Sequence, residues 1–366
     1  MRLFDLGKKP VGGQNLILAL VGIAIFVLVW WFFAEASSIK VPVLNNYETR
    51  LDIENLNRDS LAHADSLAFA HATVFRKAYP ILPTPLNVLT SYSELINKDE
   101  LVSNTGYSLW LNLKGYFWAL LIALPIGFVV GLFPLFRGLF SRIIDALRYL
   151  PLSALTGLFI IWFGINDEMK IAFLAFGILV YLLPVIVTRI DGVEDVYKTA
   201  VFTLGASKWQ TIKSAYIPSV FSNLLDDIRV LTAISWTYII IAELLNRTRG
   251  IGSLIYLKGK QGQIDKVFAA LIVIVLIGFL QDRFFAYLDR RLNPHKYFAI
   301  APEGLTETRY GIWSILGVLT LKILQEVFAP GYGNIFWQLV TVVLIASVLI
   351  IAFGEFKIYQ SKQEKK

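Results

Sequence analysis

The residue types that usually carry catalysis or metal binding are scarce in this sequence. Cysteine is absent, which excludes disulfides, thiolate metal sites and cysteine nucleophiles. His63, His71 and His295 do not have the spacing of metal ligands. The fragment KGKQG at 258–262 comes nearest to the phosphate-binding loop G-x-x-x-x-G-K-[ST], and it lacks that spacing. We therefore expect no enzymatic activity, no ATP hydrolysis and no cofactor or metal bound by this chain.

Polar and ionisable residues inside apolar stretches suggest a different chemistry. A carboxylate in an apolar helix, such as that of Glu243, is costly and is a functional candidate by default. Hydroxyl and indole groups at 143–163 and 230–245 could donate hydrogen bonds to a small anion in a water-filled pathway. The candidates for such a pathway are Ser153, Trp162, Ser235, Trp236, Tyr238 and Glu243.

Each of these residues also has a purely structural interpretation. Hydroxyls in helices commonly bond the carbonyl four residues earlier, and aromatic rings pack between helices. Glu243 could pair with Arg247 or Arg249 at the end of its stretch. In the same way, Lys322 is expected to snorkel toward the membrane surface or to pair with Glu326 one turn later.

The most informative polar segment is 190–224, which lies between two apolar stretches and contains TLGASKWQTIKSAYIP at 203–218. Six apolar residues recur there at helical spacing, and they predict a short helix that packs its apolar stripe against the protein. They are Val193, Val196, Tyr197, Ala200, Val201 and Leu204.

Capping signals divide this segment into two helices. Asp191, with Glu194 three residues later, predicts a capping box at the start of the first helix. Gly205 is expected to end that helix, because glycine adopts the left-handed conformation without strain. Ser207 and Gln210 predict a second capping box at the start of the next helix.

Pro218 is expected to end the second helix, because the residue before a proline disfavours helical geometry. Helices this short cannot span a bilayer, so three uses remain. A DNA-reading helix–turn–helix is disfavoured, since Lys208 and Lys213 are the only basic residues on the second helix. A plain connector and a docking element for a soluble partner are the alternatives, and we favour docking.

Apolar helices are the elements that must position these residues. The 366-residue chain is 56% hydrophobic and 17% charged, whereas an ordinary soluble domain is about 25% charged. A helix needs about 20 mostly apolar residues to cross a bilayer. The sequence therefore predicts an all-α polytopic membrane protein. The expected spans are 16–34, 116–132, 143–163, 171–187, 230–245, 267–287, 311–328 and 335–353.

Two N-terminal segments require their own interpretation. The flanks of 16–34 resemble those of a signal peptide, but the uncharged run has the length of a span, which favours a retained helix. Within the polar segment 36–106, apolar residues between 61 and 78 have helical spacing and predict an interfacial or cap helix. Pro83 and Pro85 then predict an extended approach to a further short helix.

The distribution of Lys and Arg predicts the orientation. These residues are more frequent in the segments that face inward when the N-terminus is inside, which predicts that both termini are cytoplasmic. The net charge of +7 is then explained by these flanks rather than by binding to nucleic acid.

From about 82 to 297 the chain resembles the permease subunits of ABC importers, in the subgroup that handles nitrate, sulfonate, taurine and related small solutes. The resemblance rests on several stretches in the family's order. They are LPTPLNVL (82–89), LRYLPLSALTGLFIIWFG (147–164), TLGASKWQTIKSAYIP (203–218), AELL (242–245), RGIGSLI (249–255) and LDRRL (288–292).

The resemblance implies partners and roles. It implies a permease dimer, expected here to be a homodimer, a cytoplasmic ATPase dimer that uses ATP and Mg, and an extracytoplasmic substrate-binding protein. It places the chain in a bacterial inner membrane, and it implies that the 190–224 loop carries a coupling helix. In this loop Thr199 stands where the family has glutamate. The implied coupling residues are Thr199, Ala200, Leu204, Gly205, Ala206, Ser207, Trp209 and Pro218.

The same resemblance predicts the domain organisation. We expect a cytoplasmic N-terminus and first span at 1–35, an extracytoplasmic insert with a proline-rich segment at 36–106, and a permease core at 107–297. Residues 298–366 are expected to add two transmembrane helices to a six-helix core.

Two other classes of function are alternatives to an importer permease. An ion-coupled secondary transporter would be favoured by an inverted repeat and by acidic residues at mid-membrane, and the sequence displays no convincing repeat. A membrane scaffold with a cytoplasmic docking loop would leave the polar content of 230–245 unexplained.

Overall fold

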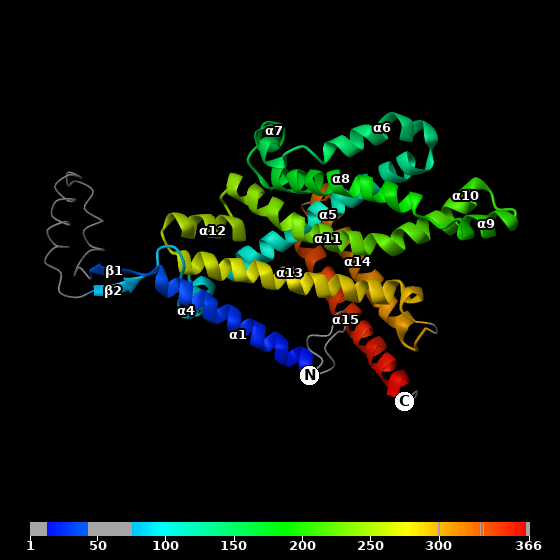
Figure 1. Cartoon of the computed structure of the whole chain (residues 1–366). Coiled ribbons are helices and arrows are strands. Elements are labelled where there is room, and N and C mark those ends of the chain that lie inside the picture. Colours follow the sequence, from blue (N-terminus) through cyan, green and yellow to red (C-terminus); the bar gives the residue numbers. More distant parts are fainter. Residues whose placement is uncertain (1–12, 43–74, 299–300, 330, 332, 364–366) are drawn as a thin grey trace, which may run out of the picture. The chain divides into compact units, whose positions relative to one another are not determined.

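The computed structural model describes residues 13–42, 75–298, 301–329, 331 and 333–363, and most of these residues are helical (Figure 1). The elements in chain order are α1 (Gly13–Ala36), β1 (Ile39–Pro42), β2 (Phe75–Ala78), α4 (Pro85–Asn97), α5 (Leu101–Leu132), α6 (Pro134–Leu147), η1 (Leu152–Leu155), α7 (Thr156–Phe163), α8 (Asp167–Asp191), α9 (Asp195–Thr203), α10 (Lys208–Thr211), η2 (Ile212–Tyr216), α11 (Ile217–Leu245), α12 (Ile251–Lys260), α13 (Ile264–Leu292), η3 (Pro294–Lys296), α14 (Leu305–Phe328) and α15 (Gly333–Gln363).

The chain divides into two compact units. The first comprises residues 1–102 and 254–272, and the second comprises residues 103–253 and 273–366. Across the described residues, seven helices are long and apolar enough to cross a bilayer, or eight if the bent pair of α6 with η1–α7 counts as one span. The prediction of an all-α polytopic membrane protein is confirmed.

The first unit contains a short two-stranded ladder that the sequence did not predict. β1 and β2 pair antiparallel, with Ile39 opposite Ala78 and Pro42 opposite Phe75. Four-residue strands carry too short a pattern to be recognised in the sequence. Most of the cap helix predicted between 61 and 78 lies outside the described residues.

The proline-rich segment of the first unit behaves as predicted. Thr84 is extended and its side chain accepts a hydrogen bond from the Asn87 backbone N–H at 3.2 Å, which caps α4. Pro85 occupies the first turn of α4, where its missing N–H costs nothing. The predicted extended approach and short helix are confirmed.

Ion pairs join α4 to the later helices of the first unit. Lys266 bonds Glu94 at 2.9 Å and Asp99 at 3.0 Å, and Lys258 bonds Asp99 at 2.6 Å. The hydrogen bond from Lys266 holds the pKa of Glu94 below its usual range. These lysines belong to residues 254–272, so the pairs tie the two sequence-distant parts of this unit together.

The span predicted at 143–163 is not a continuous helix, which corrects the sequence-based expectation. α6 and the helical segment 152–163 meet at an angle of 94°. Pro151 lies at this bend with extended backbone geometry (φ −68°, ψ 105°). Because proline lacks an N–H and disfavours helix at the preceding residue, the apolar run breaks here despite its adequate length.

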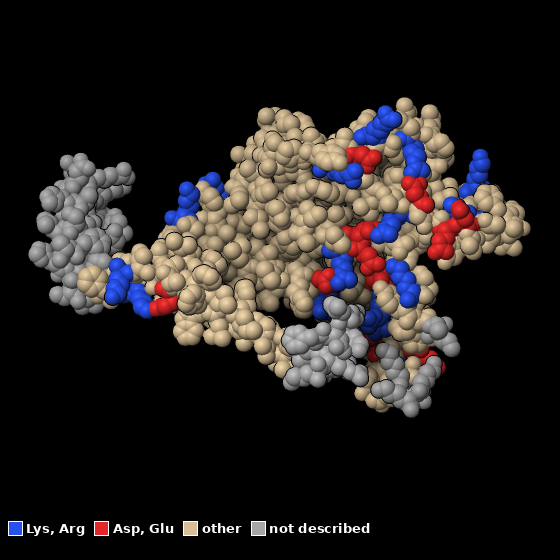
Figure 2. All heavy atoms as spheres, in the orientation of Figure 1, with Lys and Arg blue, Asp and Glu red and all other residues tan. Residues whose placement is uncertain are grey.

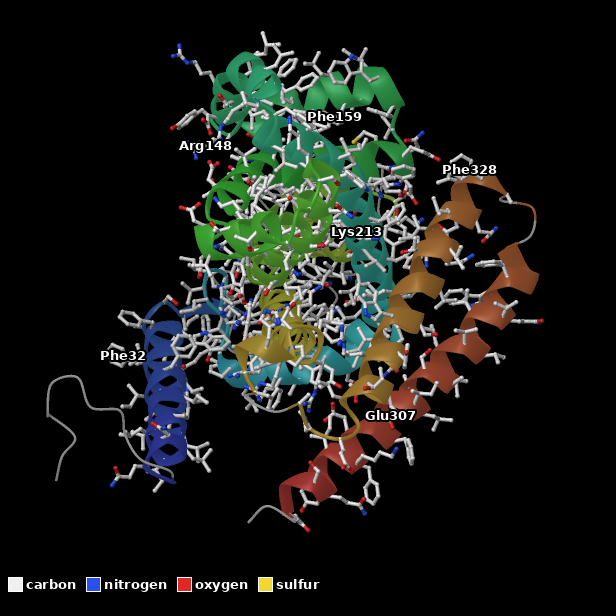
Figure 3. The ribbon with its side chains drawn as sticks, turned by 90° about the vertical axis from the view of Figure 1, so that its right-hand side faces the viewer. Phe32, Arg148, Phe159, Lys213, Glu307 and Phe328 are labelled. Atoms are coloured by element: carbon white, nitrogen blue, oxygen red, sulfur yellow. The ribbon has the colours of Figure 1, made fainter. Side chains whose placement is uncertain are left out.

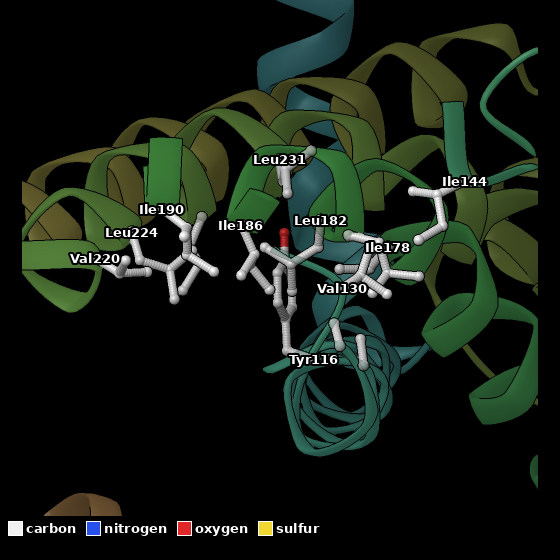
Figure 4. Close-up of a cluster of buried hydrophobic side chains, with 14 of the residues drawn as sticks. Tyr116, Val130, Ile144, Ile178, Leu182, Ile186, Ile190, Val220, Leu224 and Leu231 are labelled. Atoms are coloured by element: carbon white, nitrogen blue, oxygen red, sulfur yellow. The ribbon is translucent and has the colours of Figure 1, made fainter. Parts of the chain in front are cut away.

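The core of the second unit lies between α5, α8 and α11. Apolar side chains from the three helices and from α6 interdigitate in one buried cluster (Figure 4). Among its members are Tyr116, Val130, Ile144, Ile178, Leu182, Ile186, Ile190, Val220, Leu224 and Leu231.

Glycine permits a close approach of α5 to α8. A Cβ on Gly127 would lie 2.7 Å from Cγ2 of Ile186, and a Cβ on Gly131 would lie 2.5 Å from Cδ1 of Ile190. The four-residue spacing of Gly127 and Gly131 is the small-xxx-small pattern of membrane helix contacts. Since lipid supplies little hydrophobic force between helices, this packing contributes directly to association.

The two C-terminal helices form a hairpin in which α14 and α15 lie side by side (Figure 3). Gly354 lies against the backbone of Gly304, and the Ser347 hydroxyl donates to that of Ser314 at 2.9 Å. Ion pairs connect the hairpin to the rest of the second unit, from Glu326 to Lys114 of α5 at 2.5 Å and from Glu355 to Arg291 of α13. Lys322 lies 3.6 Å from Glu326, so their predicted pairing is confirmed.

Replacing Gly127 by valine should force α5 away from α8. Overpacking of a tight contact costs about 1–3 kcal/mol, so the thermal unfolding midpoint of the purified chain should fall. Gly278→Val in α13 is the matched control, because a Cβ there meets no atom within 4 Å. Equal destabilisation by the two variants would contradict the close-packing argument.

Candidate functional site

The 190–224 segment forms a helical hairpin at one end of the second unit, where α9 and α10 project (Figure 1). Glu194 occupies the N-cap position of α9, and its side chain makes no capping hydrogen bond. The capping box predicted at Asp191 is therefore wrong. α8 continues through Asp191, whose carboxylate instead pairs with Arg137 of α6.

The predicted end of the first hairpin helix is confirmed. Gly205 has φ +74°, in the left-handed region that favours glycine. The Gly205 N–H donates to the Phe202 carbonyl at 2.9 Å, and the Ala206 N–H donates to the Val201 carbonyl at 3.3 Å. These two bonds make a Schellman motif, which satisfies the last carbonyls of α9 and fixes the direction of the chain.

The start of the second hairpin helix is also as predicted. The Ser207 side chain accepts from the Gln210 N–H at 3.4 Å, and the Gln210 side chain accepts from the Ser207 N–H at 2.7 Å. This reciprocal pair is a capping box. The turn between α9 and α10 is thus held at both ends by backbone groups with partners.

Pro218 does not end the second helix, which corrects the prediction. Residues 208–245 run as one helical segment of 38 residues. The π-helical turn η2 lies before the proline, and the Ile217 N–H donates to the Ile212 carbonyl within it. Widening the turn lets the helix pass Pro218 in its first turn, where no N–H is required.

The hairpin presents apolar side chains on its surface. Of the predicted stripe, Val193 is buried, whereas Leu204 is 86% exposed and Val196 is 71% exposed. Phe202 and Trp209 are 59% and 68% exposed. The expectation that the stripe packs on this chain is therefore wrong. The other predicted coupling residues Thr199, Ala200, Gly205, Ser207 and Pro218 are exposed, and Ala206 is half-buried.

Charged side chains surround the base of the hairpin. Arg189 of α8 bonds both carboxylate oxygens of Asp227 in α11, each at 2.7 Å, and Lys198 bonds Asp195 at 2.5 Å. The hydrogen bond from Lys198 lowers the pKa of Asp195. On the face in Figure 2 the charges of the second unit gather toward this end, whereas its middle is mostly uncharged. Such a division is typical of a membrane-spanning body with a polar end.

A ladder of polar side chains joins α5 to α11 inside the second unit. The Ser108 hydroxyl donates to Oε1 of Glu243 at 2.6 Å, and Nδ2 of Asn112 donates to the Ser235 hydroxyl at 3.1 Å. In the third pair, the Tyr116 hydroxyl donates to the Thr232 hydroxyl at 3.3 Å. All six side chains are buried. We call these three pairs the polar ladder.

Glu243 is the end of the ladder with the most partners. Its Oε2 accepts from the Gly252 N–H at 2.7 Å, in addition to the bond from Ser108. Gly250 has φ +116°, and a Cβ there would collide with the Glu243 carboxylate. The carboxylate thus shapes the turn into α12. The alternative of a pair with Arg249 is not what holds it, because Arg249 donates to Ser103 instead.

The structure does not bring the six predicted pathway residues together. Ser235, Trp236, Tyr238 and Glu243 are buried in contacts within the chain. Trp236 donates to Gln281 of α13 at 2.7 Å, and Tyr238 packs on Gly177 and edge-on to Phe173. Ser153 and Trp162 are exposed on η1 and α7.

Trp162 lines a cavity with an aromatic wall. Phe159, Trp118 and Phe176 contribute rings, and Glu168 contributes a carboxylate. A carboxylate repels an anion, so this cavity in its present form lacks the charge expected of an anion site. Within the described ranges, no group of three His, Asp or Glu side chains is placed to hold a metal ion.

The α5 half of the polar ladder was not predicted from the sequence. Ser108, Asn112 and Tyr116 are spaced by four residues, so they lie on one helix face, and this spacing was the available signal. A second polar pair, Lys170 with Tyr107, was also not predicted. Lys170 is fully buried and donates to the Tyr107 hydroxyl at 3.0 Å. Tyr107, Ser108 and Asn112 lie in the polar first half of α5, which the predicted span 116–132 did not include.

Replacing Glu243 by alanine should destabilise the second unit. The change leaves the Gly252 N–H without its acceptor, and a buried unsatisfied donor costs about 1–3 kcal/mol. The Ser108 hydroxyl loses its bond across to α11 and keeps only the Asn104 carbonyl of its own helix. Glu243→Gln is the matched control, since it keeps the shape and one acceptor oxygen. Thermal unfolding of the purified chain measures both, and an unchanged midpoint in Glu243→Ala would refute the role of the carboxylate.

Known proteins similar to this chain were found by sequence. Residues 119–294 match the family described as "Binding-protein-dependent transport system inner membrane component". A putative aliphatic sulfonates transport permease protein of Bacillus subtilis is 30% identical over 58% of this chain and 77% of its own length. The taurine transport system permease protein of Escherichia coli is 31% identical over 58% of this chain and 79% of its own length.

A third relative extends further along the chain. The bicarbonate transport system permease protein of Synechococcus elongatus is 25% identical over 78% of this chain and 94% of its own length. The two relatives at 30% and 31% identity are covered over more than two thirds of their length. The chain therefore belongs to the binding-protein-dependent transport system inner membrane component family, and it is a permease subunit of an ABC importer.

Proposed function

We propose that this permease carries a small anion and is driven by a cytoplasmic ATPase that docks on the α9–α10 hairpin. The observation that carries the proposal is the exposed apolar surface of Val196, Phe202, Leu204 and Trp209 on a turn held by a Schellman motif and a capping box. Exposed apolar patches at a rigid protrusion are typical of protein interfaces.

The ATPase supplies ATP and Mg chemistry that this chain has no phosphate-binding loop to perform. An extracytoplasmic binding protein delivers the solute, and a second copy of the chain completes the pathway as a homodimer. Thr199 is exposed on the hairpin, where it offers a hydroxyl rather than a carboxylate to the ATPase. We therefore expect this contact to depend on apolar packing more than on an ion pair.

The orientation follows from the docking role. A cytoplasmic ATPase requires the hairpin to face the cytoplasm, and the distribution of Lys and Arg then places both termini on that side. The insert at 36–106 would face outward, where the binding protein arrives.

The pathway is proposed to run along surfaces that the single chain leaves exposed. Ser153 and Trp162 belong to such a surface, and Thr237 is exposed on the opposite side of α11 from Ser235. Ser235, Trp236, Tyr238 and Glu243 then act as positioning residues, because their polar groups already bond neighbouring helices. The substrate class is supported by the relatives, whose names specify aliphatic sulfonates, taurine and bicarbonate.

The docking role is tested by purifying the tagged full chain from its native membranes. We expect a subunit with a phosphate-binding loop to copurify and the preparation to hydrolyse ATP. An ion-coupled secondary transporter would instead catalyse uptake in vesicles that contain this chain alone, and that result would overturn the proposal. Uptake of labelled taurine, ethanesulfonate and bicarbonate by cells with and without the chain tests the substrate class separately.

Leu204→Asp should abolish copurification of the ATPase without unfolding the permease. Leu204 is 86% exposed in the single chain, so an aspartate there is solvated, whereas burial against a partner would cost several kcal/mol. Leu204→Met keeps the apolar contact and is the control. Retention of normal ATPase activity by Leu204→Asp, with an unchanged unfolding midpoint, would exclude Leu204 from the interface.

Gly205→Val should distort the turn of the same hairpin. Space is available around Gly205, but a branched residue at φ +74° is strained by about 1–2 kcal/mol. We expect transport to fall more than the thermal stability of the membrane helices. Gly262→Val in another exposed left-handed turn (φ +71°) is the control for strain alone, and equal loss of transport in both variants would contradict a specific role for this turn.

A further inference from the structure

An ionic cluster lies where the C-terminal hairpin meets α5 in the second unit. Nζ of Lys114 is 2.5 Å from one oxygen of Glu326, and Nζ of Lys322 is 3.6 Å from the other. Nζ of Lys322 also donates to the Gln325 side chain at 2.8 Å. Two ammonium groups therefore share one carboxylate, and this three-residue cluster has a net charge of +1.

Lys322 is the less compensated of the two lysines. Glu326 is closer to Lys114, and the short bond of Lys322 goes to a neutral amide. The Lys322 side chain is 9% exposed, so water does little to stabilise its charge. A charge in an apolar helix normally needs a counter-charge or access to the membrane surface.

A cavity opens at this cluster. It is lined by Gly106, Trp110, Lys322, Glu326, Gly333 and Trp337. Lys322 lines the cavity and lies 5.5 Å from the centroid of Trp337. Lys114 adjoins the wall through two lining residues, since it pairs with Glu326 and lies 5.4 Å from the centroid of Trp110. Two glycines leave room in the wall, and the remaining donors of the lysines provide positive charge. This combination suits a singly charged, phosphate-bearing headgroup.

The surroundings favour a lipid as the source of that headgroup. Leu321 and Phe328 of α14 are 56% and 76% exposed, and Leu339 of α15 is 55% exposed, so both helices that carry the cavity also present apolar surface. Phe328 marks the end of the hairpin that carries the cavity, opposite the end marked by Glu307 (Figure 3). Lys322 precedes Phe328 by six residues, about 9 Å of helical rise. Its side chain reaches about one turn toward that end, to Gln325 and Glu326, as a snorkelling lysine does. Tryptophans are enriched at this level of a membrane.

We propose that Lys114 and Lys322 bind the phosphate of an anionic phospholipid in the cavity between α5 and the α14–α15 hairpin. Its acyl chains lie along the exposed apolar faces of the hairpin. Glu326 lies between the two lysines and limits the affinity, because it competes with the phosphate for both. The bound lipid connects the hairpin, which lies beyond the family-matched residues 119–294, to a helix of the core.

The test measures the unfolding midpoint of the full chain, purified in detergent, as lipid is added. Dioleoylphosphatidylglycerol should raise the midpoint at far lower concentration than dioleoylphosphatidylcholine. The double variant Lys114→Met with Lys322→Met should raise the half-saturating concentration of the anionic lipid about 25-fold, since each basic residue near a lipid headgroup contributes about fivefold. The control Lys357→Met removes a lysine that pairs with Glu307 at the other end of the hairpin, and it should leave the titration unchanged.

Glu326→Gln gives a second, opposite signal if the double variant does not fold. Removing the competing carboxylate should lower the half-saturating concentration of phosphatidylglycerol about fivefold. An unchanged or higher value would overturn the proposal, as would an undiminished preference for phosphatidylglycerol in the double variant. An equal shift with sodium phosphate alone would identify a free anion as the ligand and would overturn the assignment to lipid.

Discussion

The polar ladder between α5 and α11 is the interaction on which the second unit depends. In a bilayer, apolar side chains gain little from leaving lipid, so helices associate through close packing and hydrogen bonds. Ser108, Asn112 and Tyr116 lie one turn apart, and each bonds a different residue of α11. A slip of either helix would break all three pairs at once. The ladder therefore fixes the register of α5 on α11, while Gly127 and Gly131 let α8 close on the other part of α5.

This register has a mechanical consequence for the proposed coupling. The helix that carries the ladder also carries the second half of the hairpin, because residues 208–245 form one segment. At 1.5 Å per residue its 38 residues extend about 57 Å, from the exposed turn to Leu245, just beyond Glu243. A displacement of Trp209 by a docked partner would thus reach the Glu243 end through a rigid element. The π turn η2 is the one irregular step on the way, and such turns are frequent at functional sites.

Local signals in the sequence predicted local structure well. The glycine turn at Gly205 and the capping box at Ser207 depend on residues within a few positions of each other, and both were correct. The box proposed at Asp191 failed because α8 continues through that residue, and a capping pattern does not reveal whether the previous helix has ended. Pro151 and Pro218 also differ in their effect on the helix, and the residues next to each proline do not reveal which effect it has. Pro151 breaks its helix, whereas a π turn accommodates Pro218.

Features that depend on distant partners were harder to predict. The start of α5 was missed because its polar residues lower the apparent hydropathy, although they are buried against a helix more than a hundred residues later. The apolar stripe of α9 was identified, but periodicity indicates only that a face is apolar. It does not say whether the surface that covers this face belongs to the same chain. The exposure of Leu204 and Val196 is what makes a second protein the better explanation.

The C-terminal hairpin illustrates what partly buried ion pairs contribute to such a protein. Glu326 bonds Lys114 near the turn of the hairpin, and Glu355 bonds Arg291 near its other end. Both pairs are partly buried, so the cost of desolvation cancels much of the attraction and these bonds add little net stability. Removing one partner is costly, however, because it leaves a charge in apolar surroundings. Two such pairs at opposite ends therefore act mainly as a register, penalising any placement of the hairpin except the one in which both carboxylates meet their cations.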